Sequence, residues 1–439
     1  MAAGGGGSAT KWPPTGCGYG MEGGGCNVDG ATPQDTAWLT RERFGLFMHW
    51  GLYAAAARHE WVQNRERIAP QAYRKYFEHF EPDLFDPAAW ARAARRAGMR
   101  YMVVTAKHHE GFCLWDSALT DYKAPNTPAG RDLLRPLLDA FRAEGLRVGV
   151  YYSLIDWHHP DFPLDGLHPL RDDLEARQRE AGRDIRRYTE YLHGQVRELL
   201  TGYGRIDYLW FDFSYAGSDW GWSRGKGRED WQSERLEAMV RELQRQIILN
   251  DRLDLGRGVR TPEERQPGRG EGATQGVWEA CQTMNGSWGY HRDSAGWRDA
   301  DDLLRTLIDA VGKGGNLLLN VGPTARGTFD PQAQARLEAI GDWMRLHGRA
   351  IYGCGASAHH PPEDCRYTQA DDRLYVHVLA WPFRRLRLEG LAGRVAYAQL
   401  LHDASEVRFR EEGADVALEL PPRAPDVRVP VVEVFLRGK

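Results

Sequence analysis

The chain has 439 residues, of which 42% are hydrophobic, and its interspersed acidic and basic residues leave a net charge of −4. This length accommodates one large domain and a smaller one. The balanced charge excludes a basic face for nucleic acid, and the absence of any apolar run of 18 residues excludes a membrane-spanning helix.

The first 35 residues are rich in glycine and lack the basic and apolar segments of a secretory signal, so residues 1–35 are predicted to form a flexible leader. No CxxC pair or zinc spacing occurs among the six cysteines, which lie at positions 17, 26, 113, 281, 354 and 365. Scattered thiols without a signal favour a reducing compartment, and we expect a cytoplasmic protein.

Short apolar runs alternate with amphipathic helical segments between residues 40 and 350. The helical segments repeat a common pattern, as in "DPAAWARAARRAG", which begins with an Asp cap and a first-turn proline and ends at Gly98. Nearly continuous apolar strands joined by helices indicate a parallel sheet covered by helices. The predicted strands are 43–50, 100–106, 147–154, 206–213, 246–250, 276–282 and 315–321.

Polar residues directly follow several of these runs, among them His49, His108, Asp156, Asp212 and Arg252. The carboxyl ends of the strands form the catalytic face of a (β/α)8 barrel, so we predict a TIM-type (β/α)8-like barrel over residues 36–352. An open doubly wound sheet is the alternative, but no GxGxxG motif follows the first run. The "GKGGN" sequence follows a helix and precedes a strand, which predicts a helix C-terminal turn and not a phosphate-binding loop.

The pattern changes after residue 352. Stretches such as "DRLYVHVLAW" and "VRVPVVEVFLR" alternate with a period of two and are interrupted by Gly, Pro and Asp. Residues 353–439 are therefore predicted to form a C-terminal all-β sandwich. Within the barrel, three long polar segments at 155–183, 214–231 and 253–275 are predicted to be functional loops at the leaving-group site.

The segment "VVTAKHHEGFCLWDS" (103–117) ends an apolar strand with two histidines and a carboxylate. A metal site, an acid–base site and a rim that holds a polar ligand are the three interpretations. Adjacent residues at a strand end point to opposite sides and lack the spacing of HExxH, which disfavours a metal. We expect His108 and His109 to donate hydrogen bonds to a hydroxyl-rich ligand, although a structural role for one of them is equally compatible with the pattern.

Many of the 16 tryptophans stand beside polar residues, as in "HWG", "HEWV", "DWHH", "LWFD" and "SWGY". Single cases are compatible with core aromatics, but repeated pairing at strand ends is typical of a sugar site, where apolar ring faces lie next to hydroxyl-binding groups.

Carboxylates suited to glycoside hydrolysis occur at three places. Asp212 ends a strand and is either a satisfied buried group or a nucleophile, Glu263 and Glu264 lie in a polar loop, and Glu279 lies on a strand. Retaining glycosidases use two carboxyl groups about 5–5.5 Å apart, one as nucleophile and one as acid/base. No GxSxG motif is present, which disfavours acyl transfer by a serine hydrolase.

Over residues 39–355 the chain resembles the α-L-fucosidases of glycoside hydrolase family 29. The similar blocks, in the order found in that family, are "RFGLFMHWGLYA", "HEWV", "VVTAKHHEGFCLWDS", "GVYYSLIDWHHP", "LWFDF", "WEACQTMNGSWGY" and "GKGGNLLLNVGPTARGTFDPQ". The resemblance implies a (β/α)8-like barrel followed by a β-sandwich, and retaining hydrolysis without a metal or other cofactor.

The resemblance also implies residue roles. Asp212 is expected to be the nucleophile, and Glu263 of "TPE" the acid/base, with Glu264 and Glu279 as alternatives. Trp288 is expected to provide an aromatic platform for the C5 methyl group of fucose. The expected fucose-binding residues are His49, Glu60, Trp61, His108, His109, Tyr151, Trp210, Arg252 and Trp288.

The predicted activity is hydrolysis of terminal α-L-fucosyl linkages in fucosylated glycans through a covalent fucosyl-enzyme intermediate. A fucose-binding module without activity and an enzyme for α-L-galactosides are the alternatives. The presence of both Asp212 and Glu263 argues against the first, and packing around Trp288 decides the second. Assembly into a homo-oligomer is compatible with the sequence.

Overall fold

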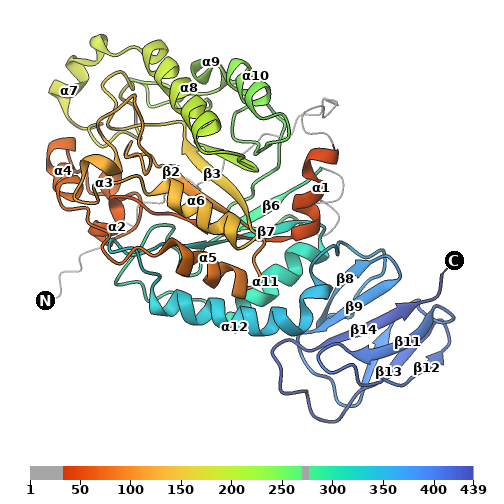
Figure 1. Ribbon diagram of the computed structural model, residues 1–439. Coiled ribbons are helices and arrows are strands. Elements are labelled where there is room, and N and C mark those ends of the chain that lie inside the picture. The colour runs from red at the N-terminus through yellow and green to blue at the C-terminus, as the bar shows by residue number, and fades with distance from the viewer. Residues whose placement is uncertain (1–32, 269–275, 439) are drawn as a thin grey trace, which may run out of the picture.

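The computed structural model describes residues 33–268 and 276–438 of the chain. Its central feature is a sheet of seven parallel strands in the order β5-β4-β3-β2-β1-β7-β6 (Figure 1). Each strand overlaps one of the predicted apolar runs. The strands are β1 (Phe44–Met48), β2 (Tyr101–Lys107), β3 (Arg147–Ser153), β4 (Tyr208–Asp212), β5 (Ile248–Leu249), β6 (Glu279–Gln282) and β7 (Asn316–Val321).

The segment 259–264 joins the two edge strands of this sheet. Val259 donates its backbone N–H to Leu249 O (2.9 Å) on the β5 side, and Glu264 donates to Cys281 O (3.0 Å) on the β6 side. Isolated parallel bridges run along both sides of the segment. The segment thus fills the eighth strand position and closes the sheet into a barrel. It belongs to the polar loop predicted for residues 253–275, of which residues 253–268 are described.

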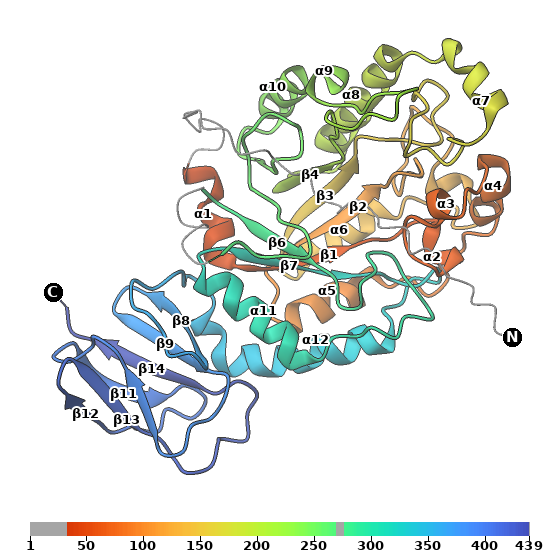
Figure 2. The ribbon, with the colours of Figure 1, turned by 180° about the vertical axis from the view of Figure 1, so that it is seen from behind.

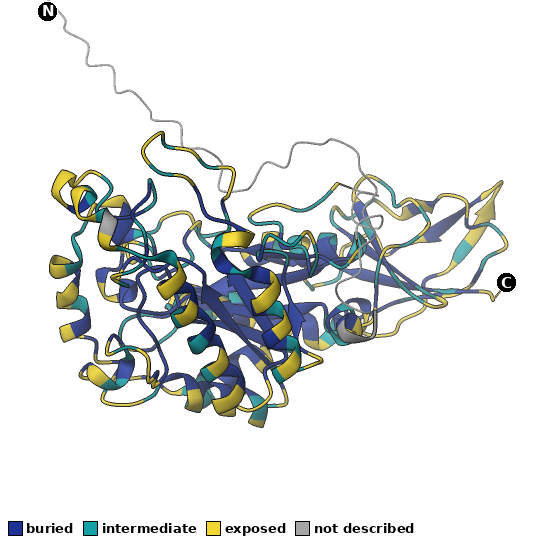
Figure 3. Cartoon of the chain, turned by 90° about the horizontal axis from the view of Figure 1, so that it is seen from above, coloured by how far each residue is buried: buried dark blue, intermediate teal, exposed yellow. Residues whose placement is uncertain are grey.

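Helices surround the strands, and their outer faces are exposed while the strands are buried (Figures 2 and 3). In α5, Asp86 caps the backbone N–H of Ala89 (2.9 Å) and Pro87 occupies the first turn, as predicted. None of the helices in the described ranges is long and apolar enough to cross a bilayer. The helices are α1 (Pro33–Glu42), α2 (Tyr53–Ala56), α3 (Val62–Arg65), α4 (Pro70–Glu78), α5 (Pro87–Arg96), α6 (Leu134–Ala143), α7 (Leu174–Gln178), α8 (Ile185–Gly202), α9 (Arg228–Trp231), α10 (Ser233–Leu243), α11 (Ala300–Gly312) and α12 (Pro331–His347), with short 3₁₀ turns η1 (Ala124–Asn126), η2 (Glu180–Gly182) and η3 (Gly348–Ala350).

The "GKGGN" segment is a helix C-terminal turn. Helix α11 ends at Gly312, Gly314 adopts φ +87°, and β7 begins at Asn316. A left-handed backbone at this position favours glycine because a Cβ would be strained. The segment therefore has no phosphate-binding geometry.

The interior of the barrel is filled from floor to rim by alternating inward-facing residues. On β4, Tyr208, Trp210 and Asp212 point the same way because the side chains of a strand repeat with a period of two. Tyr208 lies at the amino end of the strand and Asp212 at its carboxyl end. At the floor, fully buried Glu279 accepts a hydrogen bond from the Tyr101 hydroxyl.

The C-terminal part consists of two antiparallel sheets, β10-β13-β12 and β11-β14-β9-β8. Residues of both sheets, such as Leu388 and Val434, share one hydrophobic core. The part packs against α12, where Trp343 Nε1 donates to Val429 O (3.1 Å). The predicted fold class, a (β/α)8-like barrel followed by an all-β sandwich, is confirmed. The strands are β8 (Cys365–Ala370), β9 (Arg373–Val378), β10 (Arg385–Leu388), β11 (Val395–Leu400), β12 (Phe409–Glu412), β13 (Asp415–Glu419) and β14 (Val431–Leu436).

The predicted domain limits remain predictions. Most of the leader proposed for residues 1–35 lies outside the described residues, and α1 already begins at Pro33. The limit at residue 352 falls between η3 and β8.

The buried carboxyl of Glu279 leads to a prediction about stability. Burial raises the pKa of Glu279 to about 7, against the hydrogen bond from Tyr101, which lowers it. The folded chain therefore binds a proton that the unfolded chain releases near pH 4.5. Stability is lost as pH rises from that value through 7, by up to about 3 kcal/mol. In Glu279→Gln this loss should be absent, so its thermal midpoint relative to wild type should rise between pH 5 and pH 8. Parallel pH curves for the two proteins would contradict this.

Candidate active site

The predicted site residues from the barrel gather at the carboxyl ends of its strands. The imidazole ring of His108 lies 3.9 Å from that of His109 and 5.6 Å from that of His49, measured between ring centroids. His49 follows β1, while His108 and His109 follow β2. The Trp288 ring, from the loop after β6, lies 5.1 Å from His49.

Asp212, at the end of β4, is buried and held by two donors. The Tyr151 hydroxyl donates to Oδ2 (2.7 Å) and Nη1 of Arg252 donates to Oδ1 (2.7 Å). The next residue, Phe213, has φ +80°, a left-handed backbone that is costly for an aromatic residue. Such strain, of order 1–3 kcal/mol, persists where surrounding contacts enforce it, often at functional sites. The carboxylate is therefore fixed at the point where the chain turns sharply away from the strand.

Arg252 connects the two predicted catalytic carboxyl groups. Its Nη1 contacts Asp212, and its Nη2 donates to Oε2 of Glu263 (3.0 Å). The guanidinium lies 4.6 Å from the centre of the Trp210 ring, and Nε donates to Thr261 Oγ1 (3.1 Å). Burial acts to lower the pKa of Arg252, but the charges of Asp212 and Glu263 outweigh it and raise this pKa well above its ordinary value.

This arrangement suits a retaining glycosidase. One guanidinium can bond two carboxyl groups only if they lie close together, which is compatible with the separation of about 5–5.5 Å in retaining enzymes. Burial raises the pKa of Glu263 above its ordinary value, while the charge of Arg252 opposes and that of Asp212 reinforces this shift. A carboxyl group whose pKa is raised by burial is suited to donate a proton.

The two alternative acids lie elsewhere. The Oε1 atom of Glu264 accepts the backbone N–H of Thr283 (2.8 Å), so this carboxyl is bound to the segment after β6. Glu279 lies at the amino end of β6 on the barrel floor, bonded to Tyr101. Among these three glutamates, Glu263 is the one whose carboxyl shares Arg252 with Asp212.

Polar and aromatic side chains form the rest of the site. Glu60 is buried and its Oε2 accepts the N–H of Gly289 (2.9 Å), which ties the Trp288 loop to the segment after β1. The Trp61 ring lies 5.0 Å from the His109 ring. Within residues 33–268 and 276–438, no group of three or more His, Cys, Asp or Glu is arranged to hold a metal ion.

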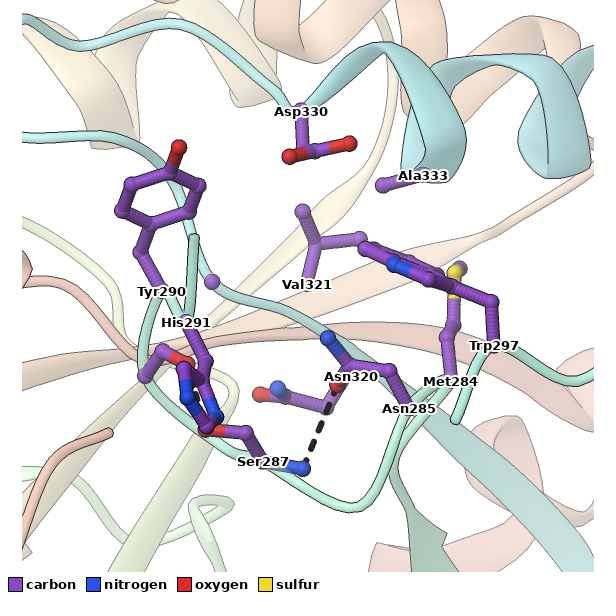
Figure 4. Close-up of a pocket in the computed structure, with 12 residues that line it drawn as sticks. Met284, Asn285, Ser287, Tyr290, His291, Trp297, Asn320, Val321, Asp330 and Ala333 are labelled. Carbon is purple, nitrogen blue, oxygen red and sulfur yellow. Dashed lines mark hydrogen bonds between the residues drawn. The ribbon is translucent and has the colours of Figure 1, made fainter. Parts of the chain in front are cut away.

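Three residues that the sequence reasoning missed support these groups: Asn320 bonds His49, Ser153 bonds His109, and Thr261 bonds Arg252. Asn320 is a polar residue inside the apolar strand β7, a signal like that of Asp212. It also lines a hollow between the Trp288 loop, the end of β7 and the start of α12 (Figure 4).

A buried ion pair joins two of the long loops. Lys226 Nζ bonds Asp165 Oδ2, which also accepts the Tyr215 hydroxyl (2.6 Å). Asp165 belongs to the segment 155–183, and Lys226 and Tyr215 to the segment 214–231. The two loops predicted to shape the leaving-group site are therefore held together.

Comparison with known proteins gives one consistent family. A family model described as α-L-fucosidase matches residues 29–349. Rat tissue α-L-fucosidase is 28% identical over 375 residues, which cover 79% of this chain and 76% of that protein. Human plasma α-L-fucosidase is 30% identical over 345 residues, which cover 72% of this chain and 69% of that protein.

Solved structures agree. Isoenzyme 1 of α-L-fucosidase from Paenibacillus thiaminolyticus is 46% identical with a TM-score of 0.87, covering 92% of this chain and 99% of that one. A trapped covalent intermediate of the family 29 α-L-fucosidase from Bacteroides thetaiotaomicron is 28% identical with a TM-score of 0.82, covering 95% of this chain and 99% of that one. Because the family model spans most of the chain and the barrel rim carries the expected groups, this protein belongs to the α-L-fucosidases of glycoside hydrolase family 29.

Proposed function

We propose that this chain, a retaining α-L-fucosidase, uses Asp212 as nucleophile and Glu263 as acid/base to release terminal α-L-fucosyl groups from glycans. One observation supports this assignment above the others: the guanidinium of Arg252 bonds Asp212 and Glu263 together in a buried site. The same cation contacts both carboxyl groups, and burial favours a proton on Glu263.

In the first step, an Asp212 oxygen attacks C1 of the fucosyl group as the bond to the leaving oxygen breaks. Glu263 gives its proton to that oxygen, so that the aglycone leaves as a neutral alcohol. Tyr151 and Arg252 hold the Asp212 carboxylate by its two different oxygens, which orients it for attack. The product is a fucosyl ester of Asp212.

In the second step, water attacks C1 and Asp212 leaves. The Glu263 carboxylate removes a proton from this water and is thereby restored as the acid. Two displacements at C1, each with inversion, release L-fucose with the original configuration.

The surrounding groups are proposed to hold the sugar. Its hydroxyls are bound by the polar atoms of His49, His108, His109 and Glu60. The aromatic rings of Trp61 and Trp288 flank its apolar face. The ring of Trp210 packs against the guanidinium of Arg252. The loops joined by Lys226 and Asp165 shape the leaving-group site. The cytoplasmic location, a homo-oligomer and a metal-independent reaction remain predictions.

Asp212→Ala should lower kcat on an aryl α-L-fucoside by about 1,000-fold or more, because no other group can form the covalent ester. Asp139→Ala, on the outer surface of α6, is the matched control and should retain wild-type turnover. Steady-state kinetics and the thermal midpoint of both variants measure this. A folded Asp212→Ala enzyme with wild-type kcat would refute the mechanism.

Glu263→Ala should be rescued by azide, which replaces water at the fucosyl ester and needs no general base, and should yield a fucosyl azide with retained configuration. The control is Glu264→Ala, whose lost carboxyl binds a backbone N–H and not the sugar. Kinetics with and without azide, together with analysis of the product, distinguish the two. Rescue of the Glu264 variant instead would reassign the acid/base.

Arg252→Met should move the alkaline limb of the pH profile of kcat/KM to higher pH. Activity requires protonated Glu263 and is lost as pH rises through its pKa, and removing the charge of Arg252 removes an influence that lowers this pKa. Arg257→Met, in the same loop but paired with Glu237, should leave the limb in place. An unchanged or acid-shifted limb in Arg252→Met would contradict the assignment of Glu263.

A further inference from the structure

The protonation of two site histidines can be worked out from their partners. His49 and His109 are buried, and burial lowers the pKa of each well below its ordinary value, aided by nearby His108. Both rings are therefore neutral at neutral pH. A neutral imidazole has one nitrogen that donates and one that accepts, so its partners decide which atoms it offers to a ligand.

Asn320 determines the donor of His49. The amide of Asn320 lies between the backbone carbonyl of Trp288, 2.7 Å from its Nδ2, and Nδ1 of His49, 2.8 Å from its Oδ1. A carbonyl oxygen can only accept, so the NH₂ group must face Trp288; the flipped amide would bring two acceptors together. The amide oxygen then faces His49, and Nδ1 of His49 must carry the proton.

Ser153 determines the donor of His109 in the same way. Its hydroxyl lies 2.7 Å from the backbone carbonyl of Ile155 and 2.8 Å from Nδ1 of His109. The one hydroxyl proton of Ser153 goes to the carbonyl, which can only accept. Oγ therefore accepts from His109, and Nδ1 of His109 must carry the proton.

We infer that Asn320 and Ser153 are positioning residues that lock His49 and His109 with the proton on Nδ1 and so present two bare Nε2 atoms as acceptors for sugar hydroxyls. Within the described residues, neither Nε2 atom makes a hydrogen bond to the protein. Neither is completely enclosed by other atoms, so each can still bond a ligand. The site thus selects sugars whose hydroxyls donate at these positions. The acceptor role of His109 replaces the donor role that the sequence led us to expect. The inference rests on the proposed function for the identity of the sugar.

Two buried histidines outside the site, His193 and His377, have the opposite arrangement. Nε2 of His193 lies 2.9 Å from the backbone carbonyl of Trp231, so it must donate. Nε2 of His377 lies 2.8 Å from Thr368 Oγ1, whose proton goes to the carbonyl of Ala350 (2.6 Å). These two rings therefore carry the proton on Nε2, and they serve as internal references.

The test on the free enzyme is nitrogen NMR of protein labelled with ¹⁵N in its histidine rings. Single variants His49→Gln, His109→Gln, His193→Gln and His377→Gln assign the signals by their loss. His49 and His109 should show the neutral form protonated on Nδ1, and His193 and His377 the form protonated on Nε2. A site ring protonated on Nε2, or charged at neutral pH, would overturn the inference.

Variants of the two positioning residues add a second readout. Asn320→Ala should change the tautomer signals of His49, and Ser153→Ala those of His109, each raising KM about tenfold through one weakened sugar hydrogen bond. Thr368→Ala is the matched control: it should change the signals of His377 and leave kcat and KM unaltered. Unchanged ring signals in both site variants would contradict the positioning role.

Ligand analogues test the acceptor role itself. Competitive binding of L-fucose is compared with analogues in which one hydroxyl is replaced by hydrogen or by fluorine, which accepts but cannot donate. At the hydroxyls bound by the two histidines, both replacements should weaken binding about tenfold. Recovery of binding by fluorine would show that the rings donate. Failure to hydrolyse any α-L-fucoside would refute the proposed function and leave the NMR result on the free enzyme independent.

Discussion

The rest of the site depends on one interaction, the pair of hydrogen bonds that the Arg252 guanidinium makes to Asp212 and Glu263. Burying Asp212 and Glu263 next to each other would be costly without a cation between them, because like charges in a low-dielectric site repel. Arg252 bonds both, and the Trp210 ring and Thr261 hold the guanidinium in place. These two bonds tie the positions of the Asp212 and Glu263 carboxyl groups to one guanidinium, so that neither can be moved without disturbing the other.

The barrel explains why these residues meet. Parallel strands bring their carboxyl ends to one rim, where Asp212 of β4 lies near residues that follow β1 and β2. The segment 259–264 closes the ring between β5 and β6 and carries Glu263 to the same rim. The identical residue type at the floor, Glu279, is fully buried at the amino end of β6 and bonded to Tyr101. Position along the barrel, and not residue type, separates the proposed acid/base Glu263 from Glu279.

The supporting contacts give the pocket a defined polarity. Asn320 ties His49 to the Trp288 loop, and Ser153 ties His109 to the segment after β3. Asn320 and Ser153 each donate to a backbone carbonyl, which can only accept, and this leaves their oxygen atoms to accept from the histidines. The direction of hydrogen bonding at the sugar is therefore set by the main chain, two steps away from the ligand.

Local patterns in the sequence determined the strands, the helix caps and the two parts of the chain, because apolar periodicity and capping residues act within a few positions. They also singled out Asp212 and the histidines as candidate site residues, since a polar side chain after an apolar run marks the rim of a parallel sheet. The choice among Glu263, Glu264 and Glu279 depended on the tertiary structure. Loop 253–275 has no periodicity to show which side chain faces Arg252, and a strand pattern does not show which end of the barrel a carboxyl occupies. Hydrogen-bond direction at His49 and His109 likewise required contacts between residues far apart in the chain, because only packing brings Asn320 to His49 and Ser153 to His109.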